Sequence, residues 1–449
     1  MDATERRLVS FAQSLAFDDL NREVLDAIKQ RFIDAIGCAL GAFDAEPAAI
    51  ARKIALRVQT PAGSGVIGTC EKSSPELAAF ANTAMIRLLD FNDDYFGKDG
   101  PHPSDTMGAI LAVADAVGAT GKEFITAVAV AYETLCGLAD AVGLRDLGWD
   151  YVTFTGAAAA LGAGKLLGLS DEHMRNALSL AIVPNCTLGQ TRLGELSMWK
   201  GLASANACRN GVFAALLAKE GITGPENCFE GGNGVFKQVS GSLDLSRFGA
   251  QPLRASVVYL KSWPVFYTAQ LPVETALVLR EKVSVEEIDS VTVESYRRIL
   301  GRGAADREKW RPSSRETADH SLPFCVAAAL LDGDISLGTF ESNRFLDRDA
   351  IELMSRVELR EDPDFTRQYP DVWNCRITAV TRSGERHVAQ VTFPKGHPKK
   401  PMTVGEVEAK FSRLAEGILP ATRCADFLDF ARDLEEAKDI GKIFELLSK

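Results

Sequence analysis

The sequence has few features of a disulfide-stabilised or secreted protein. Its nine cysteines are an odd number, and no two of them form a CxxC pair. Most lie in apolar segments, such as Cys136 in YETLCGLADA and Cys325 in LPFCVAAALL, which indicates reduced cysteines that pack as small buried side chains. The N-terminus MDATERRLVSFAQSL has no apolar signal segment, and no uncharged run approaches 18 residues. We therefore expect a cytoplasmic protein without a membrane span.

Motifs of several common protein classes are also missing. The five histidines never form HExxH, the aspartates near residue 90 lack the EF-hand spacing and its closing Glu, and no GxSxG is present. GSGVIG (63–68) matches GxGxxG but precedes TCEKSSP rather than a helix, and EGGNGVF (230–236) lacks the P-loop lysine. The net charge is −11, and no predicted helix carries a basic stripe. We expect no metal, no dinucleotide and no nucleic acid.

The first 250 residues of the chain are rich in helix signals. The segment SSPELAAFANTAMIRLLDF predicts a helix with Ser74 as its cap and Pro75 at its first position. A second helix is predicted in SDTMGAILAVADAVG, where Ser104 or Asp105 is placed to cap it. The helices that follow are rich in Ala, Gly and Ser and apolar on more than one face. Such helices are typical of the buried interior of a helical bundle.

The pattern changes after about Lys261. SVTVESY and RVELRED predict strands, and NCRITAVTRSGERHVAQVTF predicts a hairpin that turns at Ser383-Gly384. Helical periodicity returns from Val404 onward. A length of 449 residues favours two or three domains. The fold class that we expect is mainly α: a large helical domain built from both chain ends (1–265 and 401–449), with a smaller α+β lid domain inserted at 266–400.

The stretch LLDFNDDYFGKDGPHPSD (88–105) concentrates ionisable side chains between two predicted helices. Asp90 ends the first helix, and His102 directly precedes the N-terminus of the second, where backbone N–H groups favour an anion. One interpretation is a solvated loop in which the charges have no further role. The other is an acid–base site, since loops carry functional residues disproportionately often.

Two lysines lie in unusual surroundings. Lys200 is in the middle of the apolar segment SMWKGLAS, where its side chain either extends to the surface or projects into a cleft. Lys261, in VVYLKSWPVFYTAQ, lies at the predicted domain boundary, where clefts usually form. The alternative for Lys261 is an ordinary lysine of a hinge loop.

Together these segments resemble the MmgE/PrpD family, and within it the 2-methylcitrate dehydratase branch. The resemblance covers residues 30 to 405 in the family's order. It includes DFNDDYFGKDGPHPSD, LRDLGWDYVTF, QTRLGELSMWKGLASANACRNGVFAALLAKEGITGP, LKSWPVFYTAQ, WRPSSRETADHSLPFCVAAALLDG and FPKGHPKKPMT. It implies a large helical domain with a smaller inserted α+β domain, a homodimer, and cofactor-independent lyase chemistry on small di- and tricarboxylates, as in propionate metabolism.

The resemblance also implies roles for individual residues. The family's active-site aspartate and histidine correspond to Asp90 and His102, and its two active-site lysines correspond to Lys200 and Lys261. His102 is then the main acid/base, Asp90 orients it, and the lysines are catalytic residues that bind carboxylates and take part in proton transfer. Further substrate-binding candidates occur in the same stretches: Asp94, Tyr151, Arg192, Tyr267, Gln270, Arg315, His320, Lys395 and His397.

Three positions depart from the family pattern. Asp94 occupies a position where a small hydroxyl residue is expected, and Tyr151 one where relatives often carry histidine. Phe266 occupies a position where the cis-aconitate decarboxylase branch has histidine. The leading hypothesis is a dehydratase of the 2-methylcitrate type. The alternatives are an isomerase, an epimerase or a decarboxylase on a related carboxylate, or a catalytically silent paralogue.

Overall fold

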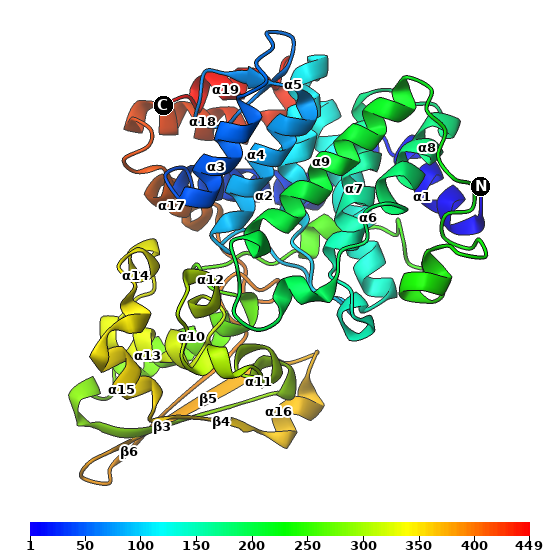
Figure 1. Cartoon of the computed structure of the whole chain (residues 1–449). Helices are drawn as coiled ribbons and strands as arrows, with labels where there is room; N and C mark the ends of the chain where they lie inside the picture. Colours follow the sequence, from blue (N-terminus) through cyan, green and yellow to red (C-terminus); the bar gives the residue numbers. More distant parts are fainter. The chain divides into compact units, whose positions relative to one another are not determined.

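The chain folds into two compact units, shown in Figure 1. The computed structural model describes residues 1–449, apart from the side chain of Arg302. Unit 1 comprises residues 1–191, 201–258 and 403–449, and unit 2 comprises residues 192–200 and 259–402. The prediction of a mainly helical chain with a small α+β part is confirmed.

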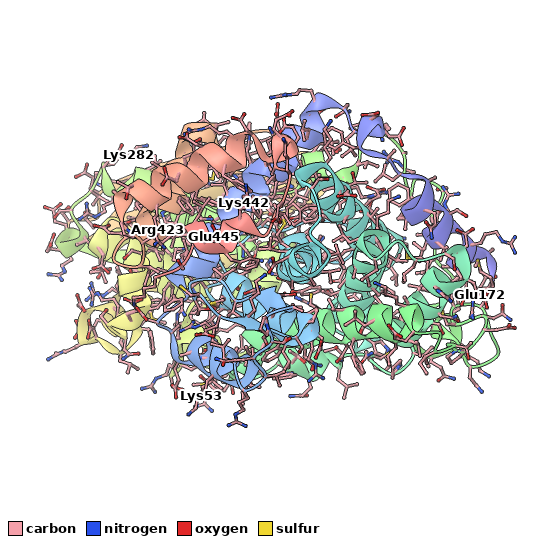
Figure 2. All side chains as sticks on the ribbon, turned by 90° about the horizontal axis from the view of Figure 1, so that it is seen from above. Lys53, Glu172, Lys282, Arg423, Lys442 and Glu445 are labelled. Atoms are coloured by element: carbon pink, nitrogen blue, oxygen red, sulfur yellow. The ribbon has the colours of Figure 1, made fainter. Side chains whose placement is uncertain are left out.

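Unit 1 is helical and takes chain from both ends of the sequence. Its one small sheet pairs β1 (Ser64–Gly65) with β2 (Lys72–Ser73). Near the C-terminus, Arg423 Nη1 donates to the carbonyl of Glu445, 3.3 Å away, and so joins the last two helices (Figure 2). The helices are α1 (Ala3–Ser14), α2 (Arg22–Gly41), α3 (Glu46–Ala55), α4 (Pro75–Leu88), α5 (Met107–Val117), α6 (Gly121–Ala141), α7 (Val152–Leu166), α8 (Asp171–Ile182), α9 (Trp199–Lys219), α17 (Val404–Ala415), α18 (Ala421–Arg432) and α19 (Lys442–Leu446). The first two residues of α9, Trp199 and Lys200, belong to unit 2.

Small residues let the central helices of unit 1 approach closely. A Cβ atom added to Gly211 of α9 would lie 2.4 Å from the carbonyl oxygen of Gly156 in α7. A Cβ atom added to Gly162 would lie 2.4 Å from Cδ1 of Ile110 in α5. Both distances are far below van der Waals contact, so these glycines are required by packing. The predicted burial of the Ala- and Gly-rich helices is confirmed, since residues 152–164 of α7 are all buried.

Helix α6 has the length and composition of a membrane-spanning segment, which the sequence did not predict. Its apolar 18-residue window is 94% buried inside the protein. A central helix that is buried inside a bundle must be apolar on all sides, so it has the same length and apolar composition as a membrane-spanning helix. The packing of α6 against α7 and α5 accounts for its composition.

Unit 2 is an α+β unit built on one four-stranded sheet, with strand order β4-β3-β5-β6. Strand β3 pairs in parallel with β4 and antiparallel with β5, and β5 and β6 form the predicted hairpin, with Ile377 opposite Ala389. Helix α10 packs on β5 and β6, and α13 packs on α10 (Figure 1). The elements are β3 (Ile288–Ser295), β4 (Val357–Glu361), β5 (Asn374–Thr381), β6 (Arg386–Thr392), α10 (Tyr267–Arg280), α11 (Arg297–Gly303), α12 (Arg315–Ala318), α13 (Leu322–Asp332), α14 (Leu337–Glu341), α15 (Arg348–Met354) and α16 (Pro363–Gln368).

One predicted helix cap is wrong, whereas the prediction for the cysteines is confirmed. Ser104 and Asp105 do not cap α5, because a 3₁₀ turn over Pro103–Thr106 leads directly into that helix. Their side chains are instead bonded to other residues of unit 1. All nine cysteines are free, and seven of them are buried.

Candidate active site

The connection between α4 and the 3₁₀ turn, residues 89–102, is buried along most of its length despite its charge. We call it the acidic loop. Only residues 96–98 are more than slightly accessible, and Asp90, Asp93 and His102 are all buried. Burying ionised carboxylates costs free energy unless hydrogen bonds or opposite charges compensate them. The interpretation of this stretch as a solvated loop is therefore wrong.

The imidazole of His102 is held by a backbone carbonyl. Its Nδ1 lies 2.6 Å from the carbonyl oxygen of Asp93, and because a carbonyl only accepts hydrogen bonds, Nδ1 carries the proton. The other ring nitrogen, Nε2, lies 3.8 Å from Oδ1 of Asp90. The ring of Tyr151 meets the imidazole edge to face at 5.8 Å. In the neutral ring Nε2 is consequently the basic nitrogen, and it faces a carboxylate.

Asp90 occupies a strained backbone position directly after α4. Its φ angle is 50°, in the left-handed region that residues other than glycine rarely adopt. The carboxylate accepts a hydrogen bond from Arg87 Nη1 at 3.0 Å, and both side chains are buried. Burial works against the charge of Arg87, but Asp90, Tyr151 and Asp105 together raise the pKa of its guanidinium above the ordinary value. Asp90 and Arg87 therefore form a buried ion pair.

The strain at Asp90 can be measured with two variants that both delete the carboxylate. Asp90→Ala keeps a Cβ atom at φ 50°, whereas Asp90→Gly does not. We expect the alanine variant to be less stable than the glycine variant by about 1 kcal/mol, because the left-handed conformation penalises a Cβ atom. Urea unfolding followed by tryptophan fluorescence measures the difference. Equal stabilities, or a more stable alanine variant, would contradict the assignment of strain.

Asp93 was not among the predicted site residues, yet its buried carboxylate accepts three hydrogen bonds. Oδ1 accepts from the backbone N–H of Ser104 at 2.9 Å and from its Oγ at 2.7 Å. Oδ2 accepts from the hydroxyl of Tyr132 in α6 at 2.8 Å. Burial raises the pKa of Asp93 to about 6, against these hydrogen bonds, which lower it. The repeated acidic letters of DFNDD did not distinguish this residue from its neighbours.

The two residues that depart from the family pattern, Asp94 and Tyr151, also lie near His102 in unit 1. Oδ2 of Asp94 is 3.7 Å from Nδ1 of His102, and its Oδ1 accepts from the backbone N–H of Tyr95 at 2.9 Å. The hydroxyl of Tyr151 donates to Oδ2 of Asp105 at 3.0 Å and lies 3.3 Å from Oγ of Ser204. Unit 1 thus brings together Asp90, Asp94, His102 and Tyr151 among the predicted residues.

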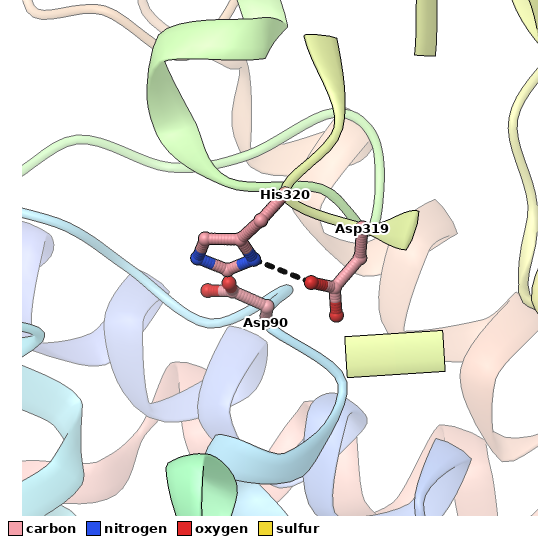
Figure 3. A group of neighbouring side chains, drawn as sticks. All are labelled: Asp90, Asp319 and His320. Atoms are coloured by element: carbon pink, nitrogen blue, oxygen red, sulfur yellow. Dashed lines mark hydrogen bonds and ion pairs between the residues drawn. The ribbon is translucent and has the colours of Figure 1, made fainter. Parts of the chain in front are cut away.

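Unit 2 holds a second cluster of ionisable groups, formed by Lys200, Asp319 and His320. Nζ of Lys200 lies 3.1 Å from Oδ1 of Asp319 and 3.2 Å from Nδ1 of His320. Nδ1 of His320 lies 2.5 Å from the same carboxylate oxygen (Figure 3). The side chains of Lys200 and Asp319 are each 1% exposed, so the interpretation of Lys200 as extending to the surface is wrong.

Asp319 is the member of this cluster that sequence reasoning missed. The signal available was its place in TADHSLP, directly before a predicted site histidine and just ahead of a helix. Phe266 stacks on the His320 ring at 5.2 Å, and Nη1 of Arg192 donates to the carbonyl of Lys200 at 3.1 Å.

Four further predicted residues of unit 2 are buried: Lys261, Gln270, Tyr267 and His397. Lys261 is completely buried. The amide of Gln270 accepts from the backbone N–H groups of Ser262 and Trp263 and donates to the carbonyls of Trp263 and Val265. Its hydrogen-bonding groups therefore hold the turn that follows Lys261. Tyr267 and His397 both contact Tyr259, at ring distances of 5.1 and 5.0 Å.

His397, Lys395 and Arg315 complete the predicted residues of unit 2. Burial, assisted by Lys399, lowers the pKa of His397 to about 4, and its Nδ1 accepts from the backbone N–H of Lys399 at 3.0 Å. His397 is therefore a neutral ring near pH 7. The backbone N–H of Lys395 donates to Glu274 at 2.7 Å, and the guanidinium of Arg315 lies 5.8 Å from the ring centre of Phe340.

Comparison with known families accounts for almost the whole chain. Residues 6–247 match the model of the MmgE/PrpD N-terminal domain, and residues 263–436 match that of the MmgE/PrpD C-terminal domain. The chain belongs to the MmgE/PrpD family. The resemblance noted from the sequence motifs is thereby confirmed.

Curated members of the MmgE/PrpD family are similar over most of this chain. The 2-methylcitrate dehydratase of Escherichia coli K12 is 28% identical, over 88% of this chain and 87% of its own length. The 2-methylcitrate dehydratase of Cupriavidus necator is 28% identical, over 84% of this chain and 82% of its own. The probable 2-methylcitrate dehydratase of Saccharomyces cerevisiae is 26% identical, over 83% of this chain and 78% of its own.

Proposed function

We propose that this MmgE/PrpD protein is a hydro-lyase that eliminates water from a 2-methylcitrate-like tricarboxylic acid without a cofactor. The observation that carries the proposal is the buried histidine–carboxylate pair of His102 and Asp90 in a chain whose dehydratase relatives match it nearly end to end. The reaction belongs to propionate metabolism. We further propose that the protein is a cytoplasmic homodimer.

The chemistry needs one base and one acid. Elimination removes a proton from a carbon next to a carboxylate and protonates the hydroxyl that leaves as water. We assign the acid/base role to His102, acting through Nε2, with Asp90 orienting the ring and stabilising its protonated form. The basic nitrogen is available because Nδ1 is already occupied by the carbonyl of Asp93.

The negative charge that develops on the substrate must be stabilised by fixed cations or dipoles. We assign Lys200 and Lys261 to this role and to binding carboxylates, because both are buried lysines of unit 2. We assign His320, whose Nδ1 lies 3.2 Å from Nζ of Lys200, to proton exchange with that lysine. The remaining residues proposed to bind or surround the substrate are Asp94, Tyr151, Arg192, Tyr267, Gln270, Arg315, Lys395 and His397.

The elimination product contains a carbon–carbon double bond conjugated with a carboxylate, which absorbs in the ultraviolet. We expect the absorbance to rise when the purified protein is incubated with 2-methylcitrate, and to rise more slowly with citrate. Carrying out the reaction with a chelator present tests cofactor independence in the same experiment. A flat trace with both acids would rule out the dehydratase assignment.

Asp94 favours a second candidate, an isomerase or epimerase of a related carboxylate. Its carboxylate, 3.7 Å from His102, places negative charge where the family pattern has a neutral hydroxyl, which disfavours a highly charged tricarboxylate. Such an enzyme would exchange a substrate C–H with solvent deuterium without releasing water. Phe266, packed on His320, occupies the position where the decarboxylase branch has histidine. This substitution disfavours decarboxylation of cis-aconitate as the reaction.

A further inference from the structure

Asp93 connects three elements of unit 1 without being exposed enough to meet a substrate. Its carboxylate accepts hydrogen bonds from the backbone N–H and the hydroxyl of Ser104, on the 3₁₀ turn, and from the hydroxyl of Tyr132, on α6. Its backbone carbonyl accepts a hydrogen bond from Nδ1 of His102. Asp93 therefore anchors the acidic loop to Ser104 and Tyr132 through its side chain, and it holds the imidazole of His102 through its main-chain carbonyl.

The identity of this side chain has a chemical reason. Three donors converge on its two oxygens, and an ionised carboxylate accepts all of them, whereas an asparagine amide would turn a donor toward one group. With a pKa of about 6, Asp93 is mostly ionised at neutral pH despite its complete burial. Charged groups that act on it from α2 are Arg31 and Asp34.

We propose that Asp93 is the positioning residue that keeps His102 in the Nδ1–H form, in which Nε2 is the proton-accepting atom. The hydrogen bonds to Ser104 and Tyr132 fix the side chain of Asp93 and therefore the direction of its carbonyl. That carbonyl fixes the tautomer and the orientation of the imidazole. Asp90, Asp94 and Tyr151 also face the ring: Oδ1 of Asp90 lies 3.8 Å from Nε2, Oδ2 of Asp94 lies 3.7 Å from Nδ1, and the carbonyl of Asp93 lies 2.6 Å from Nδ1.

The kinetic consequence of this role rests on the proposed function, but the tautomer itself does not. The test therefore uses two independent readouts on the full-length protein. Nitrogen-15 NMR of protein labelled in the histidine rings reports which nitrogen is protonated, and the His102 signal is assigned by its loss in His102→Asn. Steady-state dehydration of 2-methylcitrate reports kcat and KM.

Two variants remove the hydrogen bonds that fix the carbonyl of Asp93: Asp93→Ala removes all of its side-chain bonds, and Tyr132→Phe removes one. We expect Asp93→Ala to convert the single Nδ1–H signal into a mixture of tautomers and to lower kcat about 100-fold, with KM changed less than about 3-fold. Tyr132→Phe removes one hydrogen bond, so it should cause a smaller change of the same kind, about 10-fold in kcat. Tyr132→Phe keeps the buried ring and provides the test if Asp93→Ala does not fold.

Tyr95→Phe is the matched control. It also deletes a hydrogen bond from a tyrosine to a carboxylate, the partly buried one to Asp140, and it lies on the same acidic loop. We expect its tautomer and kcat to equal those of the wild type. The proposal is overturned if Tyr132→Phe and Asp93→Ala both keep the Nδ1–H signal, since Asp93 would then only stabilise the fold. A protein without dehydratase activity that still loses the signal in Asp93→Ala would contradict the proposed function and support the positioning role.

Discussion

Replacing His102 by asparagine should lower kcat for the dehydration by about 10²- to 10⁴-fold and leave the fold intact. The magnitude is the usual contribution of a general acid or base. An asparagine amide N–H can take the place of Nδ1 and donate to the carbonyl of Asp93, which His102 contacts at 2.6 Å. It offers no basic atom in place of Nε2. The variant therefore removes proton transfer while keeping the hydrogen bond that orders the acidic loop.

The comparison with two other variants makes this result specific. His102→Ala loses both nitrogen atoms, so it should be as inactive as His102→Asn and also less stable to urea. His173→Ala, on α8 of the same unit, should leave kcat unchanged, because His173 lies at the partly exposed start of that helix. If His102→Asn retained wild-type kcat, the acid/base assignment would be wrong, whatever the activity of the wild-type protein proved to be.

Much of the fold could be predicted because short sequence signals, such as helix starts and hairpin turns, mark many of its helices and strands. Pro75 after Ser74 marks the start of α4, and the alternation around Ser383-Gly384 marks the hairpin of β5 and β6. The cap proposed at Ser104 or Asp105 failed for a reason that no local pattern contains. Ser104 is bonded to Asp93, and Asp105 to Tyr151, which lies 46 residues away.

The candidate site could be predicted in part, and the omissions share one physical cause. Asp90 and His102 were found because they flank helix ends within one short stretch. Asp93 and Asp319 were missed, since their partners are remote in the chain: Tyr132 is 39 residues from Asp93, and Lys200 is 119 residues from Asp319. The burial that makes these carboxylates important is a property of the folded units, and their sequence neighbours do not reveal it.

The buried pair of Lys200 and Asp319 leads to the second large effect. Asp319→Ala should destabilise unit 2 by about 3–5 kcal/mol, because it leaves the Lys200 ammonium buried without its carboxylate. Lys200→Met should cost less, since Asp319 keeps its hydrogen bond to His320. Both substitutions should also abolish most of the dehydratase activity. Urea unfolding and steady-state kinetics on the same preparations measure the two effects.

The double variant Lys200→Met/Asp319→Ala separates stability from function. With both charges removed, no uncompensated buried charge remains, so we expect the double variant to be more stable than Asp319→Ala alone, with a coupling of at least 1 kcal/mol. Its activity should stay at the level of Lys200→Met, because the missing ammonium is proposed to bind a substrate carboxylate. An exposed pair in the same unit, Arg360 with Glu358, provides the control: Glu358→Gln should change stability by less than about 1 kcal/mol and leave kcat unchanged. Additive losses in the double variant would show that Lys200 and Asp319 are not energetically coupled, whereas recovered activity would show that the lysine serves only to neutralise Asp319.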